Sequence, residues 1–390
     1  MSNNRIRYLD GLRGLLALVV FVHHFLHTFY PELMLGGTQQ QFLQPGFSIW
    51  KIIALTPVNM LFNPSMAINF FFLLSGFVQS YHYLKTPDIH QLQMSMVKRY
   101  FRLALPTAAV VLLVFAFIKL GFIHKELIPR NPVSQDWVKS QLTGNMSFWQ
   151  ALKYGFIDCF ESSRGYYPVL WTMPVELFNS WMVLILLMVT HKMPRKNYLF
   201  VFWILVQIFV IDSSHSISFT IGLLLCSLHL NSQQFGRFFS HWPVKLACLL
   251  LGLYLASYPF IEYQGAIKQS MYRFISFFNQ DVYNFIIGNS FLFCLVLHSR
   301  RIKTISSKKL LQFFGEISFM FYLTHFLILF SFSPKLLAML KPSFSYEGAV
   351  TITFVLTFIL ITLLSWLMYR LVDQPSLRLC NRYVKKLFAV

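Results

Sequence analysis

The sequence LRGLLALVVFVHHFLHTFY, residues 12–30, is an apolar run with Arg13 near its start and the adjacent histidines His23 and His24 deep inside it. A helix needs about twenty such residues to cross the hydrocarbon core of a bilayer. A titratable side chain held there requires a partner, a water-filled cavity or a chemical role. The run therefore predicts a membrane-spanning helix with candidate functional histidines. An ordinary interhelical hydrogen bond is the equal alternative.

Similar apolar runs recur along the whole chain. Of its 390 residues, 56% are hydrophobic and 12% are charged, against roughly 25% charged residues in soluble domains. The runs are continuous, whereas the strands of a membrane barrel alternate over about ten residues. We therefore predict an all-α, polytopic membrane protein. About ten transmembrane helices are expected, at 12–30, 65–84, 103–121, 169–190, 198–211, 216–230, 244–260, 282–298, 311–333 and 347–370.

An even number of spans places both termini on one side of the membrane. Two thirds of the 33 lysines and arginines fall in the segments on that side. Such an excess marks the cytoplasm, so both termini are expected to be cytoplasmic. This orientation requires the two short runs that flank Asp212 and His215 to be separate spans, because merging them would invert everything downstream.

One transmembrane domain, residues 1–375, is expected, followed by a basic cytoplasmic tail, residues 376–390, with no fused soluble domain. The longest polar segment, about 122–168, is expected to be an external loop and a candidate lid. The net charge of +19 is spread between the apolar runs, so it indicates topology and not nucleic-acid binding. The five cysteines show no close pairing, and neither a disulfide framework nor a metal site is predicted. The oligomeric state is not determined by the sequence.

Three titratable residues are predicted to lie at a similar depth. Counting about 1.5 Å per residue from each helix entry places His24, His325 and Glu176 near or just beyond the middle of the bilayer. Two imidazoles and a carboxylate are suited to general acid–base chemistry. Interhelical hydrogen bonding explains the same residues equally well.

A basic cluster is predicted on the cytoplasmic side. Arg99 and Arg102 are three residues apart and share a helical face before the third span, and Arg13 is expected near the same membrane surface. Guanidinium groups so placed suit a phosphate clamp, although a single cluster is more often an orientation signal. In the second span, Ser75 and Gly76 favour close approach of a helix or a ligand. Ser75 lacks the sequence context of a nucleophile. Together these features fit group transfer between a donor from one face and an acceptor from the other.

These residues resemble the acyltransferase 3 family of integral membrane O-acyltransferases over most of the chain. The matching segments are YLDGLRG, residues 8–14, with His24 following Arg13 after ten residues; FFLLSGF, residues 71–77; RYFR, residues 99–102, with Pro106; LWT, residues 170–172, leading to Glu176; and ISFMFYLTH, residues 317–325. Each segment is weak alone, and five in order are specific.

The resemblance implies a ten-helix enzyme that moves an acyl group, most commonly acetyl from cytoplasmic acetyl-CoA, to a hydroxyl of an extracytoplasmic or lipid-linked carbohydrate. It implies His24 as the base, Arg13 as its signature partner, and Glu176, Tyr322 and His325 as secondary catalytic candidates. Arg99 and Arg102 are the implied CoA contacts, joined by Arg13 and Ser75. The family signature has one histidine, separated from the arginine by ten residues, and this chain also has His23 beside His24. Only the spacing from Arg13 favours His24 over His23 as the matching residue.

A lipopolysaccharide O-antigen in a bacterial inner membrane is the leading expectation, and a eukaryotic endomembrane is the other location considered. The expected partners are acyl-CoA, a glycan acceptor and membrane lipids. The alternative from another class is a proton-coupled transporter or lipid flippase in which His24, Glu176 and His325 relay protons.

Overall fold

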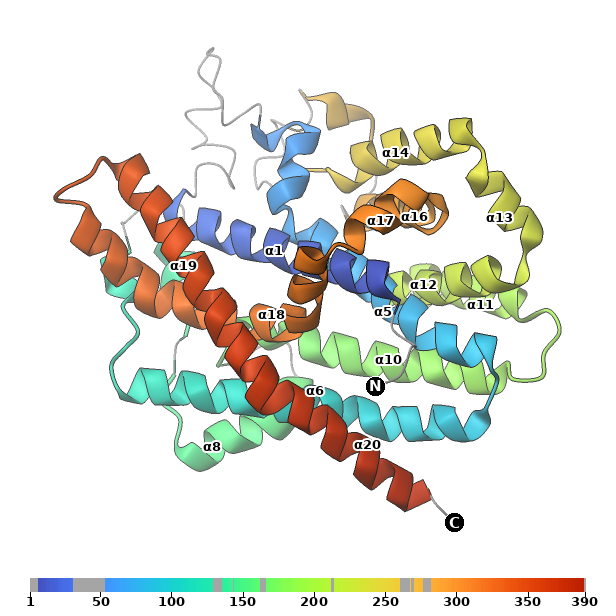
Figure 1. Cartoon of the computed structure of the whole chain (residues 1–390), viewed down its shortest axis with the longest axis horizontal. Coiled ribbons are helices and arrows are strands. Elements are labelled where there is room, and N and C mark those ends of the chain that lie inside the picture. Colours follow the sequence, from blue (N-terminus) through green and yellow to red (C-terminus); the bar gives the residue numbers. More distant parts are fainter. Residues whose placement is uncertain are drawn as a thin grey trace.

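The computed structural model describes residues 6–30, 53–128, 135–142, 144–161, 166–211, 214–259, 267, 270–275 and 282–388. All regular structure in these ranges is helical. The principal helices are α1 (Arg7–Phe29), α5 (Pro64–Lys85), α6 (Ile89–Lys119), α7 (Gln135–Ser140), α8 (Phe148–Lys153), α10 (Thr172–Val189), α11 (Lys196–Val206), α12 (Ser214–Asn231), α13 (Gln233–Ser240), α14 (Trp242–Ala256), α16 (Val282–His298), α17 (Arg300–Ser306), α18 (Lys309–Leu340), α19 (Tyr346–Met368) and α20 (Gln374–Phe388) (Figure 1). Short turns join them, among them η1 (Pro57–Phe62), η3 (Tyr154–Asp158), η4 (Pro168–Trp171), η5 (Gln207–Ile211) and η7 (Tyr369–Asp373).

Each of the ten predicted apolar runs contains a helix. Among the described residues, five helices are long and apolar enough to cross a bilayer. The number rises to seven if two bent pairs, α13 with α14 and α16 with α17, each count as one span. The chain is thus an all-helical membrane protein, while the count of ten spans and the side of the termini stay predictions.

The separation of the two short runs between 198 and 230 is confirmed. The side chain of Ser227 on α12 donates to Asn197 at the start of α11 over 2.7 Å. Nearer the other end, Thr220 donates to Gln207 over 2.9 Å. From the first hydrogen bond to the second, the residue number increases on α11 and decreases on α12. The two helices are therefore antiparallel neighbours. Asp212, in the expected turn, lies outside the described residues.

The basic cluster, predicted to share a helical face ahead of the third span, lies in the same continuous helix as that span. Helix α6 begins at Ile89, where the Asp88 side chain accepts hydrogen bonds from the backbone N–H groups of His90 and Gln91. Such a cap satisfies orphan donors at a helix start. Because α6 begins there, Arg99 and Arg102 occupy its third and fourth turns and project from a fixed helical face.

Helix α1 lies between two hydrophobic cores. Its Phe21 and Phe25 pack in one core with residues of α6, α10, α18 and α19. Its Leu16 and Val20 pack in the other with α5, α12 and α16. A helix that packs against protein on two faces needs apolar side chains around most of its circumference. This explains why the run at 12–30 is apolar on nearly all sides.

Glycines set the distance between α1 and α18. A Cβ atom at Gly315 would lie 2.2 Å from the carbonyl oxygen of Asp10, and one at Gly14 would lie 2.7 Å from the backbone nitrogen of Gly315. Small residues allow membrane helices to approach closely. Farther along, Phe21 of α1 meets Phe321 of α18, so the two helices run parallel.

The predicted Ser-Gly close approach in the second span is confirmed as a helix contact. A Cβ at Gly76 of α5 would lie 2.0 Å from the carbonyl oxygen of Phe219 on α12. Gly222 of α12 is equally close to the backbone of Leu73. The helix backbones touch at this crossing, while Ser75 faces the opposite way.

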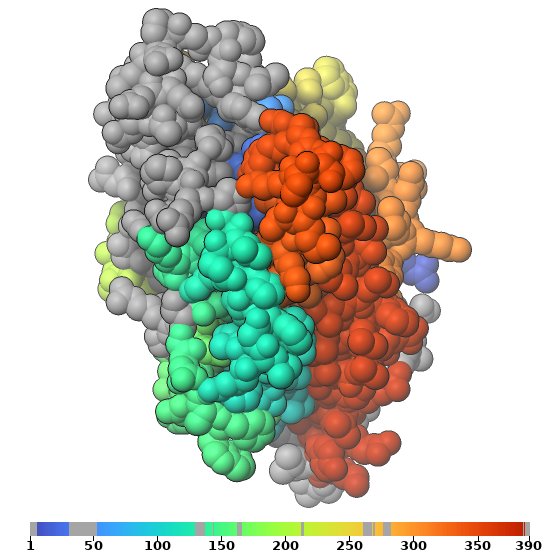
Figure 2. Space-filling model, turned by 90° about the vertical axis from the view of Figure 1, so that its left-hand side faces the viewer, coloured from blue at the N-terminus to red at the C-terminus, as the bar shows by residue number. Residues whose placement is uncertain are grey.

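The predicted C-terminal tail is helical over its described residues. Helix α19 continues through the π-helical turn η7 into α20. Helix α20 packs along α6, and in Figure 2 the red C-terminal segment borders the teal residues of α6. The tail is therefore part of the helical bundle.

Candidate active site

The two histidines predicted to lie at one depth are in contact. Nδ1 of His24 is 3.0 Å from Nε2 of His325, and the ring centroids are 5.1 Å apart with an interplanar angle of 27°. The glycine contact explains the meeting. His24 lies ten residues beyond Gly14, and His325 lies ten beyond Gly315. On parallel helices, equal steps of about 15 Å bring the two imidazoles together.

The hydrogen bonds of His325 assign the protons of the pair. Its Nδ1 lies 2.6 Å from the carbonyl oxygen of Tyr322. A carbonyl only accepts, so Nδ1 carries the hydrogen. In the neutral ring, Nε2 of His325 then accepts from Nδ1–H of His24, and Nε2 of His24 keeps its lone pair. An imidazole oriented by a second group in this way can act as a general base.

His23 takes no part in this pair. It is buried, and its Nδ1 lies 3.2 Å from the carbonyl oxygen of Phe62 at the end of η1. The bond ties α1 to the turn before α5. Of the two adjacent histidines, His24 therefore faces His325, while His23 makes a structural contact.

An aromatic wall surrounds the histidine pair. The indole of Trp137 on α7 stacks on His27, with ring centroids 4.1 Å apart, and lies parallel to His24 at 6.4 Å. Phe326 packs edge-on against both His24 and Trp137. The described residues thus place part of the predicted external loop over the histidines. We call this group, His24, His27, Trp137, His325 and Phe326, the histidine chamber.

A buried tyrosine alters α18 next to His325. The hydroxyl of Tyr167 donates to the carbonyl oxygen of Leu323 over 2.7 Å and accepts from the backbone N–H of Leu327 at 3.1 Å. A side chain inserted between these partners replaces a direct helical hydrogen bond. Tyr167 therefore fixes the turn that carries His325.

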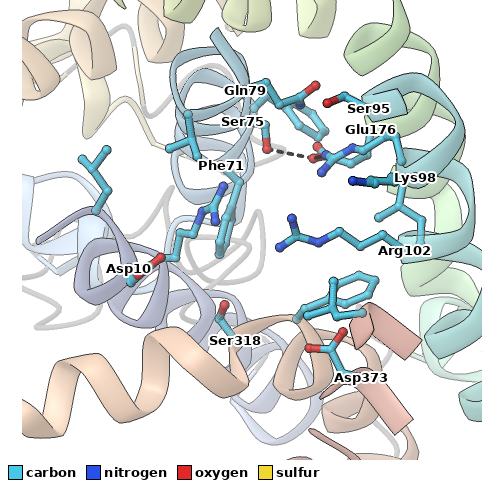
Figure 3. A pocket seen from close by; sticks show the side chains of 18 of the residues that line it. Asp10, Phe71, Ser75, Gln79, Ser95, Lys98, Arg102, Glu176, Ser318 and Asp373 are labelled. Atoms are coloured by element: carbon cyan, nitrogen blue, oxygen red, sulfur yellow. Dashed lines mark hydrogen bonds and ion pairs between the residues drawn. The ribbon is translucent and has the colours of Figure 1, made fainter. Parts of the chain in front are cut away.

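A cavity of about 560 Å³ lies beside the chamber, between α1, α5, α6, α10, α18 and α20. Its lining carries four cationic groups, Arg13, Lys98, Arg99 and Arg102, and four carboxylates, Asp10, Glu176, Glu316 and Asp373. In Figure 3, Lys98 and Arg102 extend from α6 into the space, with Glu176 and Ser75 at one wall and Asp373 at another. We call it the basic cavity.

Two of the predicted residues, Arg99 and Glu176, form an ion pair, with side chains 13% and 15% exposed. The Ser75 hydroxyl donates to the same Glu176 oxygen over 2.7 Å. Nε of Arg99 also donates to the Ser180 hydroxyl over 2.9 Å. This network joins α5, α6 and α10. Arg99 is thus held in place by its partners, whereas Arg102 forms no ion pair with any described residue.

Tyr322 links the basic cavity to the histidine chamber. It lines the cavity, and its backbone carbonyl holds His325 in the chamber. The hydroxyl donates to the carbonyl oxygen of Val169 over 2.8 Å and accepts from Thr172 at 3.1 Å. Neither His24 nor His325 lines the cavity. Tyr322 therefore stands between the cationic groups and the imidazoles.

The predicted site residues thus fall into two groups. His24 and His325 come together, but Glu176 meets Arg99 and Ser75 instead of the imidazoles. Arg13 lines the basic cavity. It lies eleven residues, or about 16 Å, from His24 along α1, too far to assist chemistry at that ring.

Sequence reasoning missed Trp137 and Tyr167, because no spacing relates either residue to the histidines. It also missed the cavity-lining face of α20. There the signal was present, since Asp373, Leu377, Cys380 and Asn381 recur at helical spacing. No three His, Cys, Asp or Glu side chains of the described ranges are placed to hold a metal ion.

The chain is similar in sequence to known acyltransferases. A family described as "Acyltransferase domain" matches residues 6–370. The chain is 23% identical to Acyltransferase R4 of Phoma sp., over 98% of this chain and 95% of that protein. It is also 23% identical to O-acetyltransferase PaAT-1 of Phomopsis amygdali, over 95% of this chain and 83% of the relative. The chain is 23% identical to Acyltransferase clz18 of Cochliobolus lunatus, over 94% of this chain and 93% of that protein. No solved structure matches.

Proposed function

The chain belongs to the acyltransferase 3 family, and from this premise we propose that it moves an acetyl group from acetyl-CoA to a hydroxyl of an acceptor inside the membrane. The observation that carries the proposal is the His24–His325 pair beside a cavity with four cationic side chains. CoA carries its phosphates at the nucleotide end and its thioester at the other. A cavity with cationic side chains beside a general base suits such a donor, whose thioester would pass Tyr322 to reach His24. The printed name of the relative PaAT-1, an O-acetyltransferase, supports an acetyl donor and an oxygen acceptor.

The proposed reaction uses His24 as the base. Nε2 of His24 takes the proton from the acceptor hydroxyl as the oxygen attacks the thioester carbonyl carbon. A carbon–oxygen bond forms and the carbon–sulfur bond breaks. The departing thiolate then receives the proton from His24. His325 accepts from Nδ1–H of His24 throughout, so it orients the base and stabilises its charged form.

For the acceptor, we propose a hydroxyl on a largely apolar molecule. The chamber walls around His24 are aromatic, with Trp137 and Phe326 among the described residues. The three relatives come from fungi, which supports a eukaryotic endomembrane over a bacterial inner membrane. A carbohydrate acceptor remains the comparison arm of the experiment. The transporter alternative required Glu176 to relay protons with His24 and His325. Glu176 instead contacts Arg99 and Ser75, which argues against that relay.

The test is acceptor-dependent release of free CoA thiol by the purified protein. Acetyl-CoA is supplied with either a lipid extract or a polysaccharide fraction, and the acetylated product is identified by mass spectrometry. His24→Ala serves as the control at matched abundance. Thiol release and an acetyl ester that both require His24 support the proposal. If the wild-type protein releases no thiol with any fraction while binding and moving a solute across vesicles, the function is transport instead.

A further inference from the structure

Helix α20 lies beyond the stretch that matches the family, which ends at residue 370. It nevertheless packs along α6, the helix that carries Lys98 and Arg102. The turn before it, η7, is π-helical, and such turns in α-helices often accompany functional sites. Asp373, the last residue of η7, points toward the space that Arg102 enters (Figure 3).

One face of this segment lines the basic cavity. Asp373, Leu377, Cys380 and Asn381 all belong to the lining. Their steps of four, three and one residues place them on one side of a helix. The opposite face carries Arg378, Leu379, Arg382 and Tyr383, all exposed. Asn381 is exposed and also lines the cavity, so this residue lies at the mouth.

The lining residues place two parts of the cavity. Tyr322 and Thr172 lie on the side of the histidine chamber. Helix α20 packs along α6, and its Cys380 lies near Lys98 and Arg102. A CoA thioester must point its acyl group toward His24, so its nucleotide comes to lie between α6 and α20. An adenine base suits this wall, because Leu377 offers apolar contact and the Asn381 amide can both donate and accept a hydrogen bond.

We propose that α20 is a donor-binding element that contacts the adenine nucleotide of CoA through Leu377 and Asn381. The inference rests on the proposed function. It adds a recognition surface outside the matched family region and assigns the nucleotide to one end of the cavity. Lys98 and Arg102 then meet the phosphates from the α6 side, and α20 covers the base.

The experiment compares two donors that share a thioester. Acetyl-CoA has the nucleotide, and S-acetylpantetheine lacks it. Leu377→Ala and Asn381→Ala are expected to raise the KM for acetyl-CoA about tenfold each, as the loss of one contact or hydrogen bond implies. Their kcat stays within about twofold, and their KM for S-acetylpantetheine stays at the wild-type value. Inhibition by adenosine 3′,5′-bisphosphate alone weakens in parallel.

The matched controls are Leu379→Ala and Arg382→Ala on the exposed face of the same helix, which should change neither KM. The nucleotide assignment would be overturned if a cavity-facing variant changed the KM for both donors equally. It would also be overturned if both cavity-facing variants kept the wild-type KM for acetyl-CoA. That result is distinguishable from failure of the proposed function, in which the wild-type protein consumes neither thioester.

Discussion

The basic cavity and the histidine chamber are neighbours with opposite character. The cavity gathers arginine, lysine and carboxylate side chains from α1, α6, α10, α18 and the turn η7, whereas the chamber holds imidazoles among aromatic rings. Tyr322 lines the first and holds His325 of the second through its backbone carbonyl. In the proposed reaction, charge recognition and proton transfer are therefore divided between two compartments. The charged donor would be held among charged side chains, and the base would lie among aromatic ones.

The largest expected effect concerns the chamber alone. His24→Ala should lower kcat by about a thousandfold, within the range of general-base contributions, and change the KM for acetyl-CoA less than twofold. The measurement is thiol release at matched protein abundance. His23→Gln is the comparison variant, because His23 bonds the Phe62 carbonyl and not His325, while its ring packs edge-on against His24 and His27. Normal transfer by His24→Ala would contradict the division of roles.

A smaller loss is expected when the base keeps its ring but loses its orientation. His325→Ala should lower kcat by roughly tenfold to a hundredfold with little change in the KM for donor. His325→Gln should recover part of the rate, since its amide oxygen can accept from Nδ1–H of His24. Steady-state kinetics of the two variants separate an orienting role from simple packing. If His325→Ala and His325→Gln lowered kcat equally, the hydrogen bond between His24 and His325 would not explain the loss.

Tyr322 tests the boundary itself. Tyr322→Ala should raise thioester hydrolysis without acceptor severalfold and lower transfer, because water in the cavity gains a path to His24. Tyr322→Phe keeps the ring and should raise hydrolysis less. Tyr254→Phe removes a phenol hydroxyl far from the site, where it bonds the Met271 carbonyl, and is the control. Hydrolysis unchanged in both Tyr322 variants would show that the ring does not separate the compartments.

The cavity arginines are expected to affect donor binding and stability, with kcat retained. Arg102→Ala should raise the KM for acetyl-CoA about tenfold with kcat retained. Arg99→Ala should instead destabilise the fold by about 3 kcal/mol, because it leaves a largely buried Glu176 carboxylate unpaired. Thermal unfolding in detergent measures the difference. The double variant Arg99→Ala with Glu176→Gln should regain stability, and failure to do so would argue against this ion pair as the cause.

Several features of the site could be predicted from single helices. Depth along a span placed His24 and His325 at one level, and their contact bears this out. The same argument placed Glu176 with them, yet depth says nothing of direction around the helix axis. Glu176 faces Arg99 and Ser75 instead. Arg13 was grouped with His24 by its spacing, although eleven helical residues separate the two side chains by about 16 Å.

The sequence by itself determined that the chain is a helical membrane protein, because hydrocarbon demands apolar runs of a certain length and internal backbone hydrogen bonds. Its ordered motifs also determined the family. Only the tertiary structure decided which helices touch. The Gly14–Gly315 contact aligns two imidazoles that lie three hundred residues apart in the chain. The packing of α20 on α6 adds Leu377, Cys380 and Asn381 to the lining of the basic cavity. Such choices depend on side-chain shape at helix crossings, and hydropathy does not record shape.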